Sequence, residues 1–293
     1  MPFGHFLFAL AVVAVWGTNF VVTRIALHEM PPLLMAVLRF VFALLPAVFF
    51  VRRPPVAWSN LAAYGLLNGV GQFGLMYLAI DGRISPGLAS LVIQCQVFFT
   101  VGLSIWLAGE RVRAYQVVGL VAATAGIAII GLHTDASVTL LGLFMMIAVS
   151  FFWGIANIVN KRAGRVSMFG YVVWASLFSV PPLVVLTLWF EGPARVMQAL
   201  TGSSAGTWAA VLWQSIGNTM FGYAAWGWLL ARHPASVVSP MGLMVPLFGM
   251  GAASVVLGEA LPPWKLAAAA LILSGLALNL LWPRLRRVLV GQG

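Results

Sequence analysis

Residues 11–24, AVVAVWGTNFVVTR, are followed 137 residues later by a related stretch, AVSFFWGIANIVNK at residues 148–161. Trp16-Gly17 aligns with Trp153-Gly154. The shared order of such pairs argues against the alternative, a chance similarity between apolar helices. We therefore predict a duplicated chain with one half at residues 1–134 and the other at 138–287. A second set recurs at an offset of 149: Ser90, Gly109-Glu110 and Gly126 return as Ser239, Gly258-Glu259 and Gly275.

The composition of the 293 residues excludes a soluble protein. Hydrophobic residues make up 62% of the chain and charged residues 8%, against about 25% charged residues in an average soluble domain. The net charge of +10 comes from basic residues scattered in twos and threes between apolar runs, which does not form a nucleic-acid-binding face. The single cysteine, Cys95, excludes an intrachain disulfide or a cysteine-based metal site.

Ten apolar runs are long enough to cross a bilayer, whose core of roughly 30 Å needs about 20 apolar residues per helix. Five spans per half is an odd number, so the second half must enter the membrane from the opposite face. An inverted duplication is typical of secondary transporters, which hold their substrate near the middle of the membrane. The runs cover residues 5–24, 32–51, 59–80, 86–108, 114–132, 138–160, 168–190, 207–230, 235–257 and 263–283. The connection at 191–206 is expected to hold a short interfacial turn.

The basic residues predict the orientation, because loops on the cytoplasmic side carry the excess of Lys and Arg. Eleven lie on the side of the termini and four on the other, so we expect both termini in the cytoplasm and the chain in the inner membrane. The eleven are Arg52, Arg53, Arg111, Arg113, Lys161, Arg162, Arg165, Arg232, Arg284, Arg286 and Arg287, and the four are Arg24, Arg83, Arg195 and Lys265.

The chain resembles the drug/metabolite transporter superfamily, EamA type, over nearly its whole length. The motifs that carry the resemblance are Trp16-Gly17-Thr18-Asn19, Arg39-Phe40 and Gly109-Glu110-Arg111 in the first half, and Trp153-Gly154, Pro246-Leu247-Phe248 and Gly258-Glu259 in the second. The aromatic-rich interior is most similar to the YddG-type exporters of aromatic amino acids. The fourth span has Val97-Phe98-Phe99 where the family often has a proline, and only the ninth span keeps one, so a kink shared by both halves is left open.

Polar side chains in lipid are costly and usually face the interior of the bundle. Asn68 and Gln72 lie four residues apart on the third span, as do Gln214 and Asn218 on the eighth. Amides both donate and accept hydrogen bonds, which suits a zwitterion; the alternative is that they join helices. Tryptophan and tyrosine rings can stack on a substrate or hold an ammonium group. The predicted substrate-binding residues are Trp16, Asn19, Asn68, Gln72, Tyr77, Gln94, Phe98, Trp153, Asn157, Gln214, Asn218, Ser239 and Met244.

Arg39 is the one charge buried within a span. It can receive a substrate carboxylate or extend toward Glu29, Asp81 or Glu259 in an ion pair; the ion pair is favoured because the family that the chain resembles carries this arginine whatever the substrate. Glu110 and Glu259 are expected to be solvated helix ends that help gating. The predicted gating or structural residues are Gly17, Arg39, Glu110, Gly154, Pro246 and Glu259.

These features predict an all-α membrane protein that exports amino acids, with a lean toward aromatic ones, by alternating access. No Asp, Glu or His lies in the middle third of any span, so we expect no intrinsic proton relay. The alternatives are a broad drug or metabolite efflux carrier and, less favoured, a membrane-embedded lipid-modifying enzyme. We expect no enzymatic activity, cofactor, metal or nucleic acid; the partners are a small-molecule substrate and the lipid bilayer, and the protein is expected to be a monomer.

Overall fold

The computed structural model describes residues 1–108, 113–135, 137–164 and 166–289. These residues form helices and no strand; their β pairing is limited to isolated bridges of Val138 with Ile84 and Asp135. The predicted all-α architecture is therefore confirmed. Glu110, a predicted gating residue, lies outside the described residues, as do Gly109, Arg111 and Arg165.

Helices of the first half follow the predicted spans closely. They are α1 (Phe3–Ala26), α2 (Pro32–Leu44), α3 (Ala47–Phe50), α4 (Trp58–Leu66), η1 (Leu67–Gly74), α5 (Leu75–Ile80), α6 (Pro86–Val92), η2 (Ile93–Cys95), α7 (Gln96–Ala108) and α8 (Ala114–Leu132).

Helices of the second half follow the same order, with one addition. They are α9 (Leu140–Arg162), α10 (Met168–Phe190), α11 (Pro193–Gly202), α12 (Ala205–Leu212), η3 (Trp213–Phe221), α13 (Gly222–Arg232), α14 (Ala235–Val238), η4 (Ser239–Met244), α15 (Val245–Leu257) and α16 (Pro263–Leu289). The connection at 191–206 holds the helix α11 rather than a turn, because Pro193 at its first position starts a helix.

Eight helical runs in the described residues are long and apolar enough to cross a membrane. The two other predicted spans, 59–80 and 207–230, lie in runs that are helical from 58 to 80 and from 205 to 232 but contain the segments η1 and η3. They carry the paired amides Asn68, Gln72, Gln214 and Asn218. The count of ten membrane spans therefore stays a prediction for these two runs.

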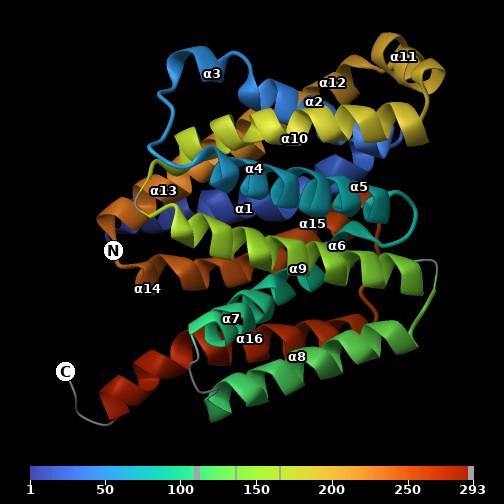
Figure 1. The fold of residues 1–293 in the computed structure, drawn as a ribbon. Helices are drawn as coiled ribbons and strands as arrows, with labels where there is room; N and C mark the ends of the chain where they lie inside the picture. Colours follow the sequence, from blue (N-terminus) through green and yellow to red (C-terminus); the bar gives the residue numbers. More distant parts are fainter. Residues whose placement is uncertain (109–112, 136, 165, 290–293) are drawn as a thin grey trace.

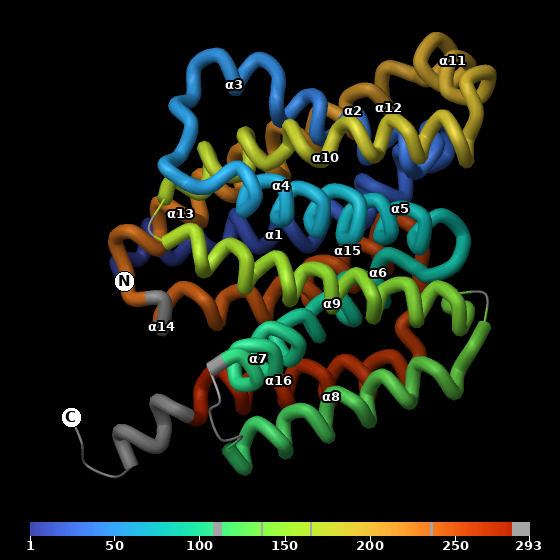
Figure 2. The backbone as a smooth tube through the Cα atoms, in the orientation of Figure 1, coloured from blue at the N-terminus to red at the C-terminus, as the bar shows by residue number. Residues whose placement is uncertain are grey.

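The first helices of the two halves, α1 and α9, run through the bundle in opposite directions. Figure 1 shows α1 beginning at the left end, where α16 finishes, and α9 beginning at the right end. The two halves interleave rather than lie side by side: α1 packs on α15, α2 on α10, α7 on α9 and α8 on α16, as the tube in Figure 2 also shows. A Cβ atom at Gly17 would lie 2.5 Å from the Val245 carbonyl oxygen, so α1 and α15 approach closely only because residue 17 is glycine.

Irregular helix segments occur at matching places in the two halves. η1 and η3 are π-helices in the third and eighth runs, and η2 and η4 are 3-10 segments in the fourth and ninth. Pro246 follows η4 directly, in the first turn of α15, whereas η2 has no proline. The two halves thus share a break in this span, and the absence of a proline at residues 97–99 does not prevent it.

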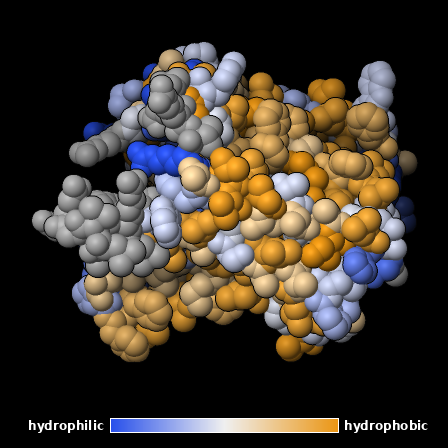
Figure 3. Space-filling view, turned by 90° about the horizontal axis from the view of Figure 1, so that it is seen from below, coloured by the Kyte–Doolittle hydropathy of each residue, from blue (hydrophilic) through white to orange (hydrophobic). Residues whose placement is uncertain are grey.

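The outer surface suits a lipid environment. Figure 3 shows a face that is largely hydrophobic, with the strongly hydrophilic residues near the two ends of the bundle. Large apolar side chains on this surface include Trp106, Val118, Trp189 and Val255, all more than half exposed. Because exposed apolar area on this scale is unfavourable in water, the chain is a multi-span membrane protein.

Candidate functional site

Arg39 on α2 lies at the centre of a buried polar cluster built from both halves. The residue is only 1% exposed. Its Nη1 donates to the Gln214 Oε1 atom at 2.6 Å and to the Tyr77 hydroxyl at 3.1 Å. The Arg39 Cζ atom lies 3.7 Å from the centre of the Phe73 ring, a cation–π contact. The cluster therefore holds a desolvated cation between helices α2, η1, α5 and η3.

Both amides of η3 contact this arginine. Gln214 also donates from Nε2 to the Thr23 hydroxyl at 2.8 Å. With the Asn218 amide oriented so that its oxygen faces Arg39, that oxygen accepts from Nη1 and Nη2 at 3.0 Å each, and from Asn19 Nδ2 at 3.2 Å. The structure thus brings four predicted site residues, Asn19, Tyr77, Gln214 and Asn218, around Arg39.

The π-helical geometry of η3 leaves backbone carbonyls that side chains satisfy. Trp16 Nε1 donates to the Asn218 carbonyl at 3.2 Å, and the Thr219 hydroxyl donates to the Gln214 carbonyl at 2.9 Å. The Trp16 ring also lies 5.1 Å from the Trp226 ring and 6.1 Å from the Tyr223 ring. Trp16 therefore joins an aromatic wall on α13 to the polar cluster. Single-turn π segments in helices are frequent at functional sites.

The amides of η1 bond differently from those of η3. Asn68 Nδ2 donates to Gln72 Oε1 at 2.8 Å, and both residues are buried. This is the internal bond that two side chains four residues apart on a helix can form. Among the described residues, neither amide is bonded to Arg39 or to an amide of η3.

The other predicted site residues lie on the broken fourth and ninth runs and on α9. Gln94 in η2 donates to the Gly242 carbonyl in η4 at 2.8 Å, so the two 3-10 segments meet. Asn157 donates to Gln96 Oε1 at 2.7 Å, which joins α9 to α7 apart from the Arg39 cluster. A Cβ at Gly154 would lie 2.7 Å from the Phe99 Cβ. The remaining members are half-buried beside the core: Phe98, Trp153, Ser239 and Met244.

The expected ion pair of Arg39 is wrong. Of the three carboxylates considered, Asp81 lies 4.0 Å from Arg24, Glu259 pairs with Lys265, and Glu29 accepts from the Ser204 amide and the Thr207 hydroxyl. No carboxylate of the described residues pairs with Arg39, because its side chain stays among the amides instead of extending to a membrane interface.

The expectation that Glu259 is solvated is also wrong. Its side chain is 8% exposed and lies 2.9 Å from Lys265 Nζ, which is itself buried. Glu259 also accepts from the Ser85 hydroxyl and from the Gly87 amide at the first turn of α6. The Lys265 ammonium group and the N-terminus of α6 compensate the desolvation of this carboxylate. Glu259 is thus a structural contact between the halves.

Sequence reasoning missed the partners that complete these clusters. Thr23, Phe73 and Lys265 are contacts of Gln214, Arg39 and Glu259. Thr23 had a usable signal, because it lies four residues after Asn19 on the same face of one helix. Phe73 had no such signal in the sequence, because a phenylalanine in an apolar helix does not indicate that a cation lies beside it.

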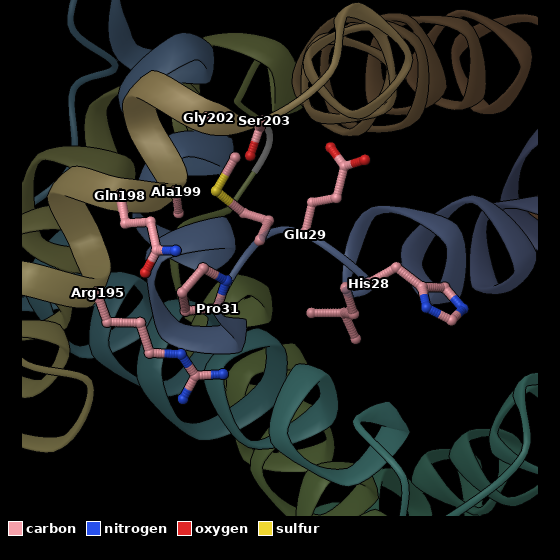
Figure 4. A pocket seen from close by; sticks show the side chains of 10 residues that line it. His28, Glu29, Pro31, Arg195, Gln198, Ala199, Gly202 and Ser203 are labelled. Atoms are coloured by element: carbon pink, nitrogen blue, oxygen red, sulfur yellow. The ribbon is translucent and has the colours of Figure 1, made fainter.

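A cavity of about 340 Å³ lies at the end of the bundle opposite the N-terminus, and it contains none of the predicted site residues. Figure 4 shows it between the turn after α1, with His28, Glu29 and Pro31, and the helix α11, with Arg195 and Gln198. The Ser204 backbone amide, followed by the Thr207 and Ser204 hydroxyls, lowers the pKa of Glu29. The carboxylate therefore stays ionised while it joins this turn to α12.

Comparisons with known proteins identify the family to which the sequence is similar. The sequence model of the EamA-like transporter family matches residues 3–132 and 140–281. The chain is 39% identical to a protein of Salmonella typhimurium named "Probable amino-acid metabolite efflux pump", over 95% of both chains. It is 36% identical to the Escherichia coli protein of that name, again over 95% of both.

Two more distant similarities extend the comparison. A "Probable terminal-alkyne amino-acid exporter" of Streptantibioticus cattleyicolor is 25% identical over 78% of this chain and 75% of its own. A solved crystal structure aligns with a TM-score of 0.66 over 96% of this chain and 97% of its own, at 20% identity. At that identity the likeness shows the fold alone.

Proposed function

The chain belongs to the EamA-like transporter family of membrane proteins, and we propose that it exports amino acids and related small metabolites across the inner membrane by alternating access. The observation that carries the proposal is the polar cluster in which Asn19, Arg39 and Tyr77 of the first half meet Gln214 and Asn218 of the second. A site between two repeats is where secondary transporters bind substrate. The printed names of the relatives favour amino acids as the substrate class.

The proposed movement is a change in how the two halves pack around this cluster. We place the halves at residues 1–134 and 138–287, inverted relative to each other. The breaks in the third, fourth, eighth and ninth runs support this movement, because discontinuous helices let one end of a span shift while the other stays packed. Both termini then face the cytoplasm, as the basic loops indicate.

An aromatic side chain on the substrate fits the surroundings of the cluster. Trp16, Tyr223 and Trp226 form contacts on one side of Asn218, and Phe73 packs against Arg39. Aromatic rings stack on each other in offset or edge-to-face geometry and add to the burial of apolar area. We therefore propose aromatic amino acids as the preferred members of the substrate class.

Counterflow in proteoliposomes tests the proposal. Vesicles with the purified chain are loaded with each of the twenty amino acids in turn, with sugars and cationic dyes as controls. Uptake of labelled amino acids, largest for aromatic ones, is the expected result, without any imposed pH gradient. Dye transport without any amino acid transport would favour the broad drug carrier instead, and flux that requires a pH gradient would contradict the uncoupled mechanism.

Substitutions link the flux to the proposed site. Trp16→Ala, Trp153→Ala and Gln72→Ala are expected to lower counterflow more than Trp58→Ala. Trp58 is the matched control because it is 46% exposed and packs against Trp174 and Phe178 at the edge of the bundle. Equal losses of counterflow in all four variants, at equal amounts of folded protein, would show that the flux does not depend on this site.

A further inference from the structure

One edge of the Arg39 guanidinium has no hydrogen-bond partner among the residues that the structure describes. Asn218 accepts from both Nη1 and Nη2, so it occupies the end of the guanidinium fork. Gln214 and Tyr77 also accept from Nη1. The Nε atom is buried and has no hydrogen-bond partner in the described part of the chain. Because Nε–H and one N–H of Nη2 point along the same side of the planar group, one complete edge is available.

This free edge matches the geometry of a carboxylate. Arginine and carboxylate groups form two parallel N–H to O bonds, and those bonds are stronger than bonds between neutral groups. A buried cation without an anion is costly, and such a cation in a folded protein is usually paired or hydrogen-bonded. In the described residues, Arg39 has polar and aromatic neighbours and no carboxylate.

A second unused group lies beside the first. The Asn19 Oδ1 atom is also buried without a partner among the described residues, although its Nδ2 donates to Asn218. The same Asn218 oxygen contacts Asn19 Nδ2 at 3.2 Å and Arg39 at 3.0 Å, so the unused acceptor and the unused donor edge belong to neighbouring groups. An acceptor next to a cationic donor is complementary to an ammonium next to a carboxylate.

We propose that this arrangement is the receptor for the head group of an α-amino acid. Arg39 Nε and Nη2 bind the carboxylate, and Asn19 Oδ1 accepts from the ammonium group. The inference rests on the proposed transport of amino acids and assigns the part of the substrate that all of them share. Gln214, Tyr77 and Phe73 orient the guanidinium without contacting the substrate carboxylate.

Selectivity for the head group follows from this assignment. A substrate that lacks the carboxylate leaves the Arg39 edge unpaired, and losing one partner of a buried charged pair costs about 30-fold or more in affinity. A substrate that lacks the ammonium group leaves Asn19 Oδ1 unpaired, which costs less because that group is neutral. The side chain of the substrate is then free to vary, in agreement with the proposed export of amino acids and related small metabolites.

The first test needs no variant. The full-length chain in detergent is heated with L-phenylalanine, L-phenylalaninamide, phenylethylamine and 3-phenylpropanoate, and with the equivalent series from L-leucine. We expect L-phenylalanine or L-leucine to raise the unfolding midpoint at concentrations where the amide and the amine do not. The proposal is wrong if amide and amino acid raise the midpoint equally. If no amino acid raises it and none shows counterflow, the proposed function itself fails.

Variants locate the effect. Arg39→Gln is expected to abolish the difference between L-phenylalanine and its amide, and Arg39→Lys to keep a smaller difference, because lysine retains the charge without the two-bonded edge. Arg24→Gln is the matched control: Arg24 is 32% exposed and lies 4.0 Å from Asp81 at the end of α1. An Arg39→Gln protein that folds and still prefers the free carboxylate about 30-fold would overturn the assignment.

Discussion

The π-helical segments η1 and η3 are alike in sequence and different in bonding. Each carries two amides four residues apart, at matching places in the two halves. In η3, Gln214 and Asn218 bond to Thr23 and Arg39 of the other half, whereas in η1 Asn68 and Gln72 bond to each other. Duplication therefore supplies the same segment twice, and its neighbours give the two copies different roles.

The source of the difference is a single charge. Arg39 on α2 has no charged counterpart on α10, where Ser176 lies 137 residues later and donates to the Val172 carbonyl. The amides of η3 thus accept hydrogen bonds from a buried cation, and those of η1 bond to each other within one segment. We infer that η3 orients Arg39 at the contact between the halves, while η1 can exchange its internal bond for a further bond to substrate.

The largest expected effect is a difference in stability between variants of η3 and variants of η1. Gln214→Leu removes the acceptor of the bond from Arg39 Nη1 and the donor of the bond to the Thr23 hydroxyl. It is expected to lower the free energy of unfolding by about 3 kcal/mol, since bonds to charged groups contribute about 1.5–3 kcal/mol. Gln72→Leu removes one bond between neutral groups and should cost about 1 kcal/mol while still reducing counterflow. Thermal unfolding of both variants in detergent measures the difference. Equal losses of stability would show that η1 and η3 do not differ in this role.

A smaller effect is expected from crowding the first residue of α13, directly after η3, against α1. A Cβ atom at Gly222 would lie close to Trp16 Nε1, so Gly222→Ala must displace the indole from the Asn218 carbonyl. Overpacking of this kind costs about 1–3 kcal/mol. Gly251→Ala is the matched control, because no heavy atom lies within 4 Å of a Cβ added there. An unchanged unfolding midpoint for Gly222→Ala would show that Trp16 moves freely and does not hold η3.

Trp16→Phe isolates a single hydrogen bond of the same contact. The ring is largely kept while the N–H that satisfies the π-helical carbonyl of Asn218 is lost. We expect a loss of about 1 kcal/mol, and no comparable loss for Trp58→Phe, whose indole packs against Trp174 and Phe178. The unfolding midpoints of the two variants, measured side by side, decide whether the carbonyl depends on Trp16.

The smallest effect concerns pH at the end of the α1–α13 contact. His5 Nδ1 and His233 Nε2 lie 2.7 Å apart, within hydrogen-bond distance. Desolvation, followed by His5, lowers the pKa of His233. The folded state therefore binds fewer protons than the unfolded chain, so the contribution of His233 is complete above the unfolded pKa of about 6.5 and is lost as pH falls below it.

The unfolding midpoint between pH 8 and pH 5.5 measures this effect. It is expected to fall toward pH 5.5 in the native chain and to fall less in His233→Gln. His28→Gln is the control, because His28 is exposed at the opposite end of α1. An identical pH profile for the native chain and His233→Gln would show that the histidine pair adds nothing to the stability of the contact between α1 and α13.

Much of the fold was predictable because each span ends in Pro, Gly or charge. The helix breaks were harder to predict: nothing in the composition of residues 67–74 or 213–221 indicates π-helix, and η2 forms without a proline. These breaks arise from tertiary packing, which overrides local preference. Trp16 docking on η3, for example, compensates a carbonyl that only the folded bundle creates.

The buried polar residues were predictable to the level of residue type. The amides at i and i+4 on the third and eighth runs are all buried, as expected, and Arg39 stood out as a charge in an apolar run. The choice of its partner was wrong because the length of an arginine side chain allows it to reach an interface, and the sequence does not show that Gln214 and Asn218 lie nearer. Distances between halves are a property of the inverted packing and cannot be read from spacing along one helix.

The interleaving of the halves has a consequence for how the chain is made. During synthesis, α1 and α2 leave the ribosome long before α15 and α10, on which they pack. Arg39 must therefore enter the membrane well before Gln214 and Asn218 exist to accept its N–H groups. The first half is an incomplete intermediate that depends on water, lipid head groups or insertion machinery until the second half arrives. Biogenesis, rather than transport alone, thus limits where a charge can be placed in this chain.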